Sequence, residues 1–176
     1  PDLAKSTRKY SVYPDDAAAF AWMRQGAPAG RRCLEAQIMD LSDDIAYSVH
    51  DVEDAVATRK LDPSDLYDDA HADAVIASTL GWYGASVARS DLEDALTRIV
   101  SMPEWLRSFD GSYGSLARLK DATSELIGRF CSATVRATRE AFGDEPLGRY
   151  RADLVVPRQV RAEIQILKGM AVHYVM

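Results

Sequence analysis

The chain has 176 residues, of which 47% are hydrophobic and 27% charged, a balance that suits one globular domain with a sizeable core. The formal net charge of −6 argues against a broad nucleic-acid-binding surface, which usually carries clustered Lys and Arg, although it allows a small basic pocket. No run approaches the ~20 apolar residues of a membrane span, so we expect a cytoplasmic protein. Cys33 and Cys131 lie far apart and form no metal-binding pair, so we expect reduced thiols.

The predicted elements are almost all helical. Asp15 and Asp16 favour the positive end of a helix dipole and open a first short helix, which the stretch 26–30, containing Gly and Pro, ends. Gly143 supplies a C-terminal glycine for a long helix, and Pro157 is well placed to open the last one. The helices that we expect cover residues 17–25, 34–58, 71–88, 91–101, 115–142 and 157–176, with a short helical turn at 103–108.

Residues 149–156 are the one extended or strand-like stretch that the sequence predicts. The fold class that we expect is therefore all-α, with at most one short strand segment at that place. Pro1 is no natural initiator, and residues 168–176 stop inside an apolar helical pattern without a cap. We therefore expect residues 1–176 to form a single, partial helical domain of a longer protein.

The helix expected at 34–58 has two sharply different faces. Aliphatic residues recur at helical spacing from Leu34 to Val56. The opposite face falls within an arc of roughly 120° at about 100° per residue. It carries Asp40, Asp43, Asp44, Tyr47, His50, Asp51 and Asp54.

Two interpretations of this acidic face stay open. The first is a face that is simply solvated. The second is a polar pocket or cation site, which the absence of Lys and Arg from residues 35–58 favours, since exposed helix faces usually mix both charges. Asp is also a poor helix former, whereas hard cations take carboxylate oxygens as ligands.

The segment Leu34–Asp54 resembles the signature helix of bacterial deoxyguanosine triphosphate triphosphohydrolases and their dGTPase-like relatives, which belong to the HD-domain superfamily. Weaker resemblance continues in residues Lys9–Tyr13, Leu126–Phe130 and Glu163–Lys168, so it covers most of the chain. The resemblance implies an HD-domain-like helical bundle, of which this chain would be the C-terminal portion.

Site residues follow from the resemblance one by one. Asp43 resembles the final metal-binding Asp of the family, with Asp44 as the alternative. Tyr47 resembles a Tyr that touches substrate phosphate, and Asp51 occupies the place of a carboxylate near the terminal phosphate. His50 is either part of the pocket or a solvated side chain.

Substrate phosphates also need cations, and we select Lys9 and Lys168 as substrate-binding residues. Lys168 interrupts an apolar helical run. The alternative interpretation is a lysine whose aliphatic part is buried and whose ammonium group only reaches solvent at the helix surface. Other basic candidates, for each of which solvation is the alternative, are Arg118, Lys120, Arg149 and Arg151.

The remaining metal ligands of the family, a His and a His-Asp doublet, lie upstream of the final Asp. This chain has no His before Asp43. His50 and Asp51 follow Asp43 on the same helix and are rejected as the doublet, and His71 and His173 come in the wrong order. We therefore expect the catalytic residues, including a His implicated as a base, to lie upstream, and this chain to be inactive alone.

The function that the resemblance implies is metal-dependent hydrolysis of dGTP to deoxyguanosine and triphosphate, with Mg²⁺, Mn²⁺ or another transition metal as cofactor. A homo-oligomer is expected, without a membrane or nucleic-acid partner. The alternatives are another HD-type nucleotide phosphohydrolase and a non-catalytic helical module for regulation or oligomerisation. The preferred deoxynucleotide, allosteric activation and the oligomeric state do not follow from the sequence.

Overall fold

The computed structural model describes residues 12–84 and 87–175. Within them the regular structure is entirely helical, which confirms the all-α fold class. The α-helices are α1 (Ala17–Met23), α2 (Leu34–Ala57), α3 (Asp69–Tyr83), α4 (Arg89–Val100), α5 (Tyr113–Phe142) and α6 (Arg158–Val175), with 3₁₀ turns η2 (Pro14–Asp16) and η3 (Pro63–Tyr67).

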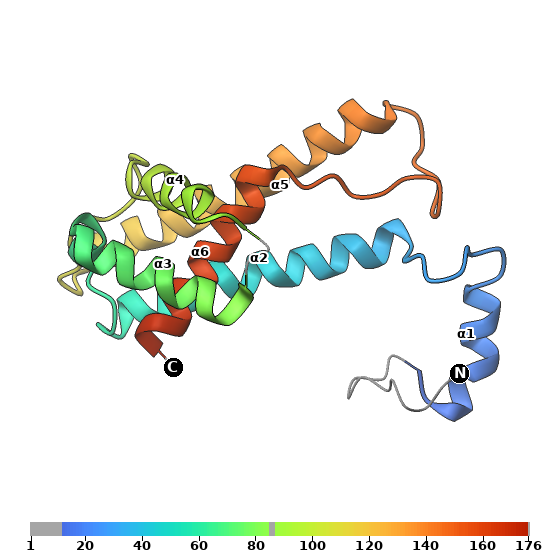
Figure 1. Cartoon of the computed structure of the whole chain (residues 1–176), viewed down its shortest axis with the longest axis horizontal. Coiled ribbons are helices and arrows are strands. Elements are labelled where there is room, and N and C mark those ends of the chain that lie inside the picture. The colour runs from blue at the N-terminus through green and yellow to red at the C-terminus, as the bar shows by residue number, and fades with distance from the viewer. Residues whose placement is uncertain (1–11, 85–86, 176) are drawn as a thin grey trace.

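Helix α6 is the centre of the bundle (Figure 1), packing against α2, α3 and α4 and more lightly against α5. Its residues Ile166, Leu167 and Met170 are fully buried. Gly169 allows α3 to approach closely, because a Cβ at this position would collide with the Thr79 side chain. The core of the molecule thus lies around α6, and the site described below lies along one side of it.

Helix α2 has the two faces that its sequence predicts. Ile45, Val49, Val52 and Val56 are buried in the core. Ile38 is an exception, with 46% of its surface exposed. The reason is visible in Figure 1, where the N-terminal half of α2 extends beyond the bundle and away from α3 and α6.

The strand-like stretch 149–156 forms no strand within the described residues; it is a turn followed by extended chain. Its backbone donors find side chains instead of a neighbouring strand. Leu154 N donates to Gln37 Oε1 (2.9 Å) and Val155 N donates to Thr138 Oγ1 (3.0 Å). The segment therefore connects α2 and α5, and these two backbone N–H groups are hydrogen-bonded without a neighbouring strand.

Several helix ends differ from the sequence prediction for local reasons. α3 stops at Tyr83, because Gly84 has a positive φ of 67°. α4 begins at Arg89 without a side-chain cap, and Asp91 pairs with Arg158 of α6. Residues 103–108 form turns and coil where a helical turn was expected.

A buried carboxylate joins three helices. Glu163 of α6 is only 4% exposed. Its Oε1 accepts from Arg98 Nε of α4 (2.6 Å), and its Oε2 accepts from Arg129 Nη2 of α5 (2.6 Å). Because α5 has few other contacts with α6, this charged triad is a principal connection between them.

Candidate functional site

The predicted site residues of α2 lie together on its exposed face. Asp43, Asp51 and His50 are exposed, and Tyr47 has 62% of its surface accessible. Within the described residues, Asp43, Tyr47 and Asp51 make no side-chain hydrogen bond or ion pair, so all three are available to a ligand or to solvent. Lys9, the other predicted phosphate-binding lysine, lies outside the described residues.

The two candidate metal ligands, Asp43 and Asp44, differ in their partners. Lys168 Nζ donates to Asp44 Oδ1 at 2.5 Å, so an ammonium from α6 already balances this carboxylate. The carboxylate of Asp43 has no such partner in the described part of the chain. A cation that needs a free anionic oxygen is therefore better served by Asp43 than by Asp44.

The acidic face of α2 has basic partners that come from outside the helix. Lys168 pairs with Asp44, and Arg32, which precedes α2, pairs with Asp40. Residues 35–58 contain no Lys or Arg, but two of their Asp residues are nevertheless paired with cations from elsewhere in the chain. Asp43, Asp51 and Asp54 stay unpaired among the side chains that the structure describes.

Lys168 lies where two cavities of the α2/α6 surface meet. The first cavity has a volume of about 430 Å³. Its lining consists of Arg32, Gln37, Asp40, Leu41, Asp44, Val87, Leu154, Val156, Arg161, Ile164, Gln165 and Lys168. Its charged groups are therefore three cations and two carboxylates, and both carboxylates are paired.

The second cavity has a volume of about 350 Å³ and lies further along α2 and α6. Its lining consists of Asp51, Asp54, Ala55, Thr58, Lys60, Tyr83, Lys168, Ala171, Val172 and Val175. Two carboxylates oppose two lysines here, and the other side chains are mainly apolar. Lys168 and Asp51, both predicted to bind substrate, therefore share one cavity.

His50 belongs to a different cluster. Its Nδ1 lies 3.4 Å from Glu53 Oε2, and the Glu53 carboxylate also accepts from Thr123 Oγ1 (2.8 Å) and pairs with Lys120 of α5. Burial alone would raise the pKa of Glu53, but the hydrogen bonds from Lys120 and Thr123 outweigh it and lower that pKa. His50 and Lys120 thus belong to the α2–α5 contact.

The other two histidines also have local partners. His71 Nδ1 lies 2.9 Å from Asp68 Oδ1 at the start of α3, and His173 Nδ1 lies 2.9 Å from Ser78 Oγ. Within the described residues, no three His, Cys, Asp or Glu side chains gather to hold a metal ion. The described residues therefore do not complete a metal site, and Asp43 as a metal ligand stays a prediction.

The fold and site define an all-helical domain with an acidic helix beside two ligand-sized cavities. Comparison with curated proteins finds relatives named deoxyguanosinetriphosphate triphosphohydrolase-like protein: 50% identical in Streptomyces coelicolor, 48% in Bifidobacterium longum and 40% in Corynebacterium glutamicum. The alignments cover 96%, 97% and 96% of this chain. The chain is thus similar along nearly its whole length to proteins with this name, which confirms the resemblance seen in its sequence.

The chain spans about two fifths of the length of these relatives, with 40%, 36% and 40% covered respectively. No protein-family model matches the chain, and no solved structure matches it. Within residues 12–84 and 87–175, no helix is both long enough and apolar enough to cross a membrane.

Proposed function

We propose that the full-length protein is a metal-dependent hydrolase that cleaves dGTP, or a closely related deoxynucleoside triphosphate, into the deoxynucleoside and inorganic triphosphate. This chain contributes Asp43 as a metal ligand and the cavities on either side of Lys168 as part of the substrate site. The names of the homologous proteins support a nucleotide triphosphohydrolase family.

The observation that most directly supports this function is the free carboxylate of Asp43 beside paired neighbours. Asp40 and Asp44, which line the first cavity, are each paired with a cation, whereas Asp43, which lies between them in the sequence and outside the lining, has no such partner among the described residues. A bound divalent cation would polarise the phosphate and lower the pKa of a bound water. Asp43 would hold that cation through an oxygen ligand of the kind that Mg²⁺ and Mn²⁺ prefer.

The chain's own residues have separate roles in the proposed reaction. Tyr47 lies one turn from Asp43 and Asp51 one turn further, so both follow the same exposed face. We assign the Tyr47 hydroxyl as a hydrogen-bond donor to substrate. Lys168 supplies positive charge that offsets the charge of the phosphates.

Product analysis on the full-length protein tests this function. Incubation with dGTP and Mn²⁺ or Mg²⁺ should release deoxyguanosine and triphosphate in equal amounts, and Asp43→Ala should remove both turnover and bound metal. Asp121→Ala, which changes an exposed Asp of α5 that has no ion pair within the described residues and lines neither cavity, is the matched control and should retain metal and turnover. Release of orthophosphate would instead identify another HD-type phosphohydrolase.

The exposure of the acidic face also bears on the non-catalytic alternative, a helical module for regulation or oligomerisation. A face that is only solvated predicts that Asp43→Ala leaves metal content and turnover of the full-length protein unchanged. That result would favour the non-catalytic role of this chain. Triphosphate release by residues 1–176 alone would contradict our expectation that this chain is inactive by itself.

A further inference from the structure

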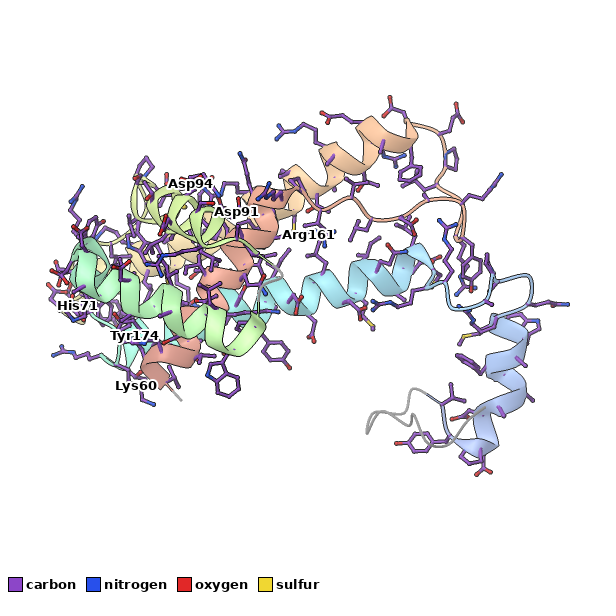
Figure 2. All side chains as sticks on the ribbon, in the orientation of Figure 1. Lys60, His71, Asp91, Asp94, Arg161 and Tyr174 are labelled. Atoms are coloured by element: carbon purple, nitrogen blue, oxygen red, sulfur yellow. The ribbon has the colours of Figure 1, made fainter. Side chains whose placement is uncertain are left out.

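One end of the molecule extends beyond the bundle as an arm, which consists of α1, residues 34–41 of α2 and residues 135–142 of α5. Figures 1 and 2 show α1 at the opposite end of the molecule from Lys60 and Tyr174 of the bundle. Among the described elements, α1 packs against the short turn η2 and has no extensive contact with another helix. The arm therefore receives little support from the core around α6.

The arm exposes apolar side chains on each of its three helices. Every residue of α1 is exposed, and Trp22 has 75% of its surface accessible. On α2, Ile38 lies two helical turns before the buried Ile45 and on the same aliphatic face, yet it is exposed. On α5, Val135 and Phe142 are exposed and follow one face in the same way. The apolar faces of these helices thus continue past the bundle, where no described residue covers them.

α1 differs from an ordinary surface helix in how little holds it. Single exposed apolar side chains are common on folded proteins and need no partner. However, α1 buries none of its seven residues, and an isolated helix shorter than about 12–15 residues is marginal in water. Its largest side chain, Trp22, is also of the type that contributes most to interfaces. The sequence and exposure of α1 are therefore typical of a surface that another part of a protein covers.

The base of the arm, in contrast, is held by specific polar contacts. Arg24 Nη1 donates to the carbonyl oxygen of Arg31 (2.6 Å), and the Arg24 guanidinium lies 5.5 Å from the centre of the Tyr150 ring. Arg149 Nη1 donates to the carbonyl oxygen of Met23 (3.5 Å). These contacts fix the position of α1 relative to the chain that leads into α6. A surface that is already in position loses less conformational entropy when a partner covers it.

The occupant that the observations favour is the part of the same protein outside this chain. The chain spans about two fifths of the length of its relatives, so about three fifths of their length lies outside the match. A segment of the same polypeptide has a high effective concentration at the arm, whereas a second copy has to be recruited from solution. A contact within one polypeptide is therefore favoured over an equal contact between two copies.

We propose that the apolar residues of the arm, Trp22 above all, lie in an internal interface that the remaining part of the same polypeptide covers. That part presents an apolar surface to α1, and the polar contacts at the base of the arm hold α1 in place to receive it. The interface belongs to the architecture of the full-length protein. It does not depend on the proposed hydrolysis of a deoxynucleoside triphosphate.

Hydroxyl-radical footprinting of the unmodified full-length protein measures this burial without any substitution. The oxidation rate of each residue is compared with its rate in the denatured protein. Trp22 should react at least about fivefold more slowly in the folded protein, since the core of an interface is packed like a protein interior. Tyr113, which is 94% exposed at the far end of α5, is the reference for an open position and should react at nearly its denatured rate. A Trp22 that reacts as fast in the folded as in the denatured protein would overturn the proposal.

Photo-crosslinking identifies what covers the arm. Trp22 is replaced by the photoreactive residue benzoylphenylalanine in a mixture of full-length proteins labelled with light and heavy nitrogen. The expected products join this position to residues outside the present chain and carry one isotope only, because both ends belong to one polypeptide. Products of mixed isotope would show that a second copy covers the arm and would refute the internal interface. The same photoreactive residue at Tyr113 is the control and should give few such products.

Discussion

Lys168 and Asp44 lie 124 positions apart in the sequence and join α6 to α2 through a contact of 2.5 Å between Nζ and Oδ1. The lysine side chain is mostly covered, and the aspartate is more than half exposed. The pair therefore balances a carboxylate of the acidic face while keeping the ammonium at the junction of the two cavities.

Removing the charge of Asp44 should release this ammonium. Asp44→Asn is expected to change the free energy of unfolding by less than about 1 kcal/mol, because partly exposed ion pairs contribute little. It should tighten triphosphate binding, since Lys168 no longer has a competing anion, and Lys168→Met should weaken it. Calorimetry at two salt concentrations measures both, and the difference between the variants should shrink at high salt. Tighter binding by both variants would contradict this role.

The Lys168–Asp44 pair also marks what the sequence could predict and what it could not. Periodicity was sufficient to place Ile45, Val49 and Val52 in the core, because a helix repeats its faces at a fixed interval. It was insufficient to find the cation opposite Asp44, because that contact depends on how α6 packs against α2. The sequence also did not indicate that Arg161 of α6 lines the first cavity, for the same reason.

Glu53 is a second residue of α2 whose partners could not be predicted from the sequence. Its carboxylate belongs to the helix whose Asp residues are exposed, yet it is buried against Lys120 and Thr123 of α5. Its place outside the acidic arc, on the side towards the buried Val49, was a signal of burial. Its partners could only be known from the tertiary structure, as could the extended path of residues 152–157, which depends on Gln37 and Thr138.

The buried triad around Glu163 should be essential for stability. Glu163→Gln keeps the shape of the side chain but leaves Arg98 and Arg129 without their shared anion. We expect a loss of about 3 kcal/mol in the free energy of unfolding, the lower end for breaking a buried ion pair, since both arginines are partly exposed. Chemical denaturation measures this loss. Glu125→Gln on the exposed side of α5 is the control, and an equal loss there would argue against the triad.

The close approach of α3 and α6 makes a second stability prediction. Gly169→Ala places a methyl group against the Thr79 side chain and should cost about 1–3 kcal/mol, as overpacking of a core does. Thr79→Ala removes the nearest atom, so the double variant should be more stable than the sum of the two single effects implies. A thermodynamic cycle from thermal or chemical unfolding measures the coupling. Strict additivity would show that the two side chains do not meet.

The start of α3 should respond to pH through His71. The hydrogen bond to Asp68 raises the pKa of His71 above its ordinary value, and the bond from His71 in turn lowers the pKa of Asp68. Because the folded-state pKa of His71 is the higher one, its contribution to stability is fully present below about pH 6.5, the unfolded value, and is lost as the pH rises through the folded pKa. Titration of the His71 ring by nuclear magnetic resonance should give a pKa that falls in Asp68→Asn. An unaltered His71 pKa in Asp68→Asn would show that the carboxylate is not the cause of the shift.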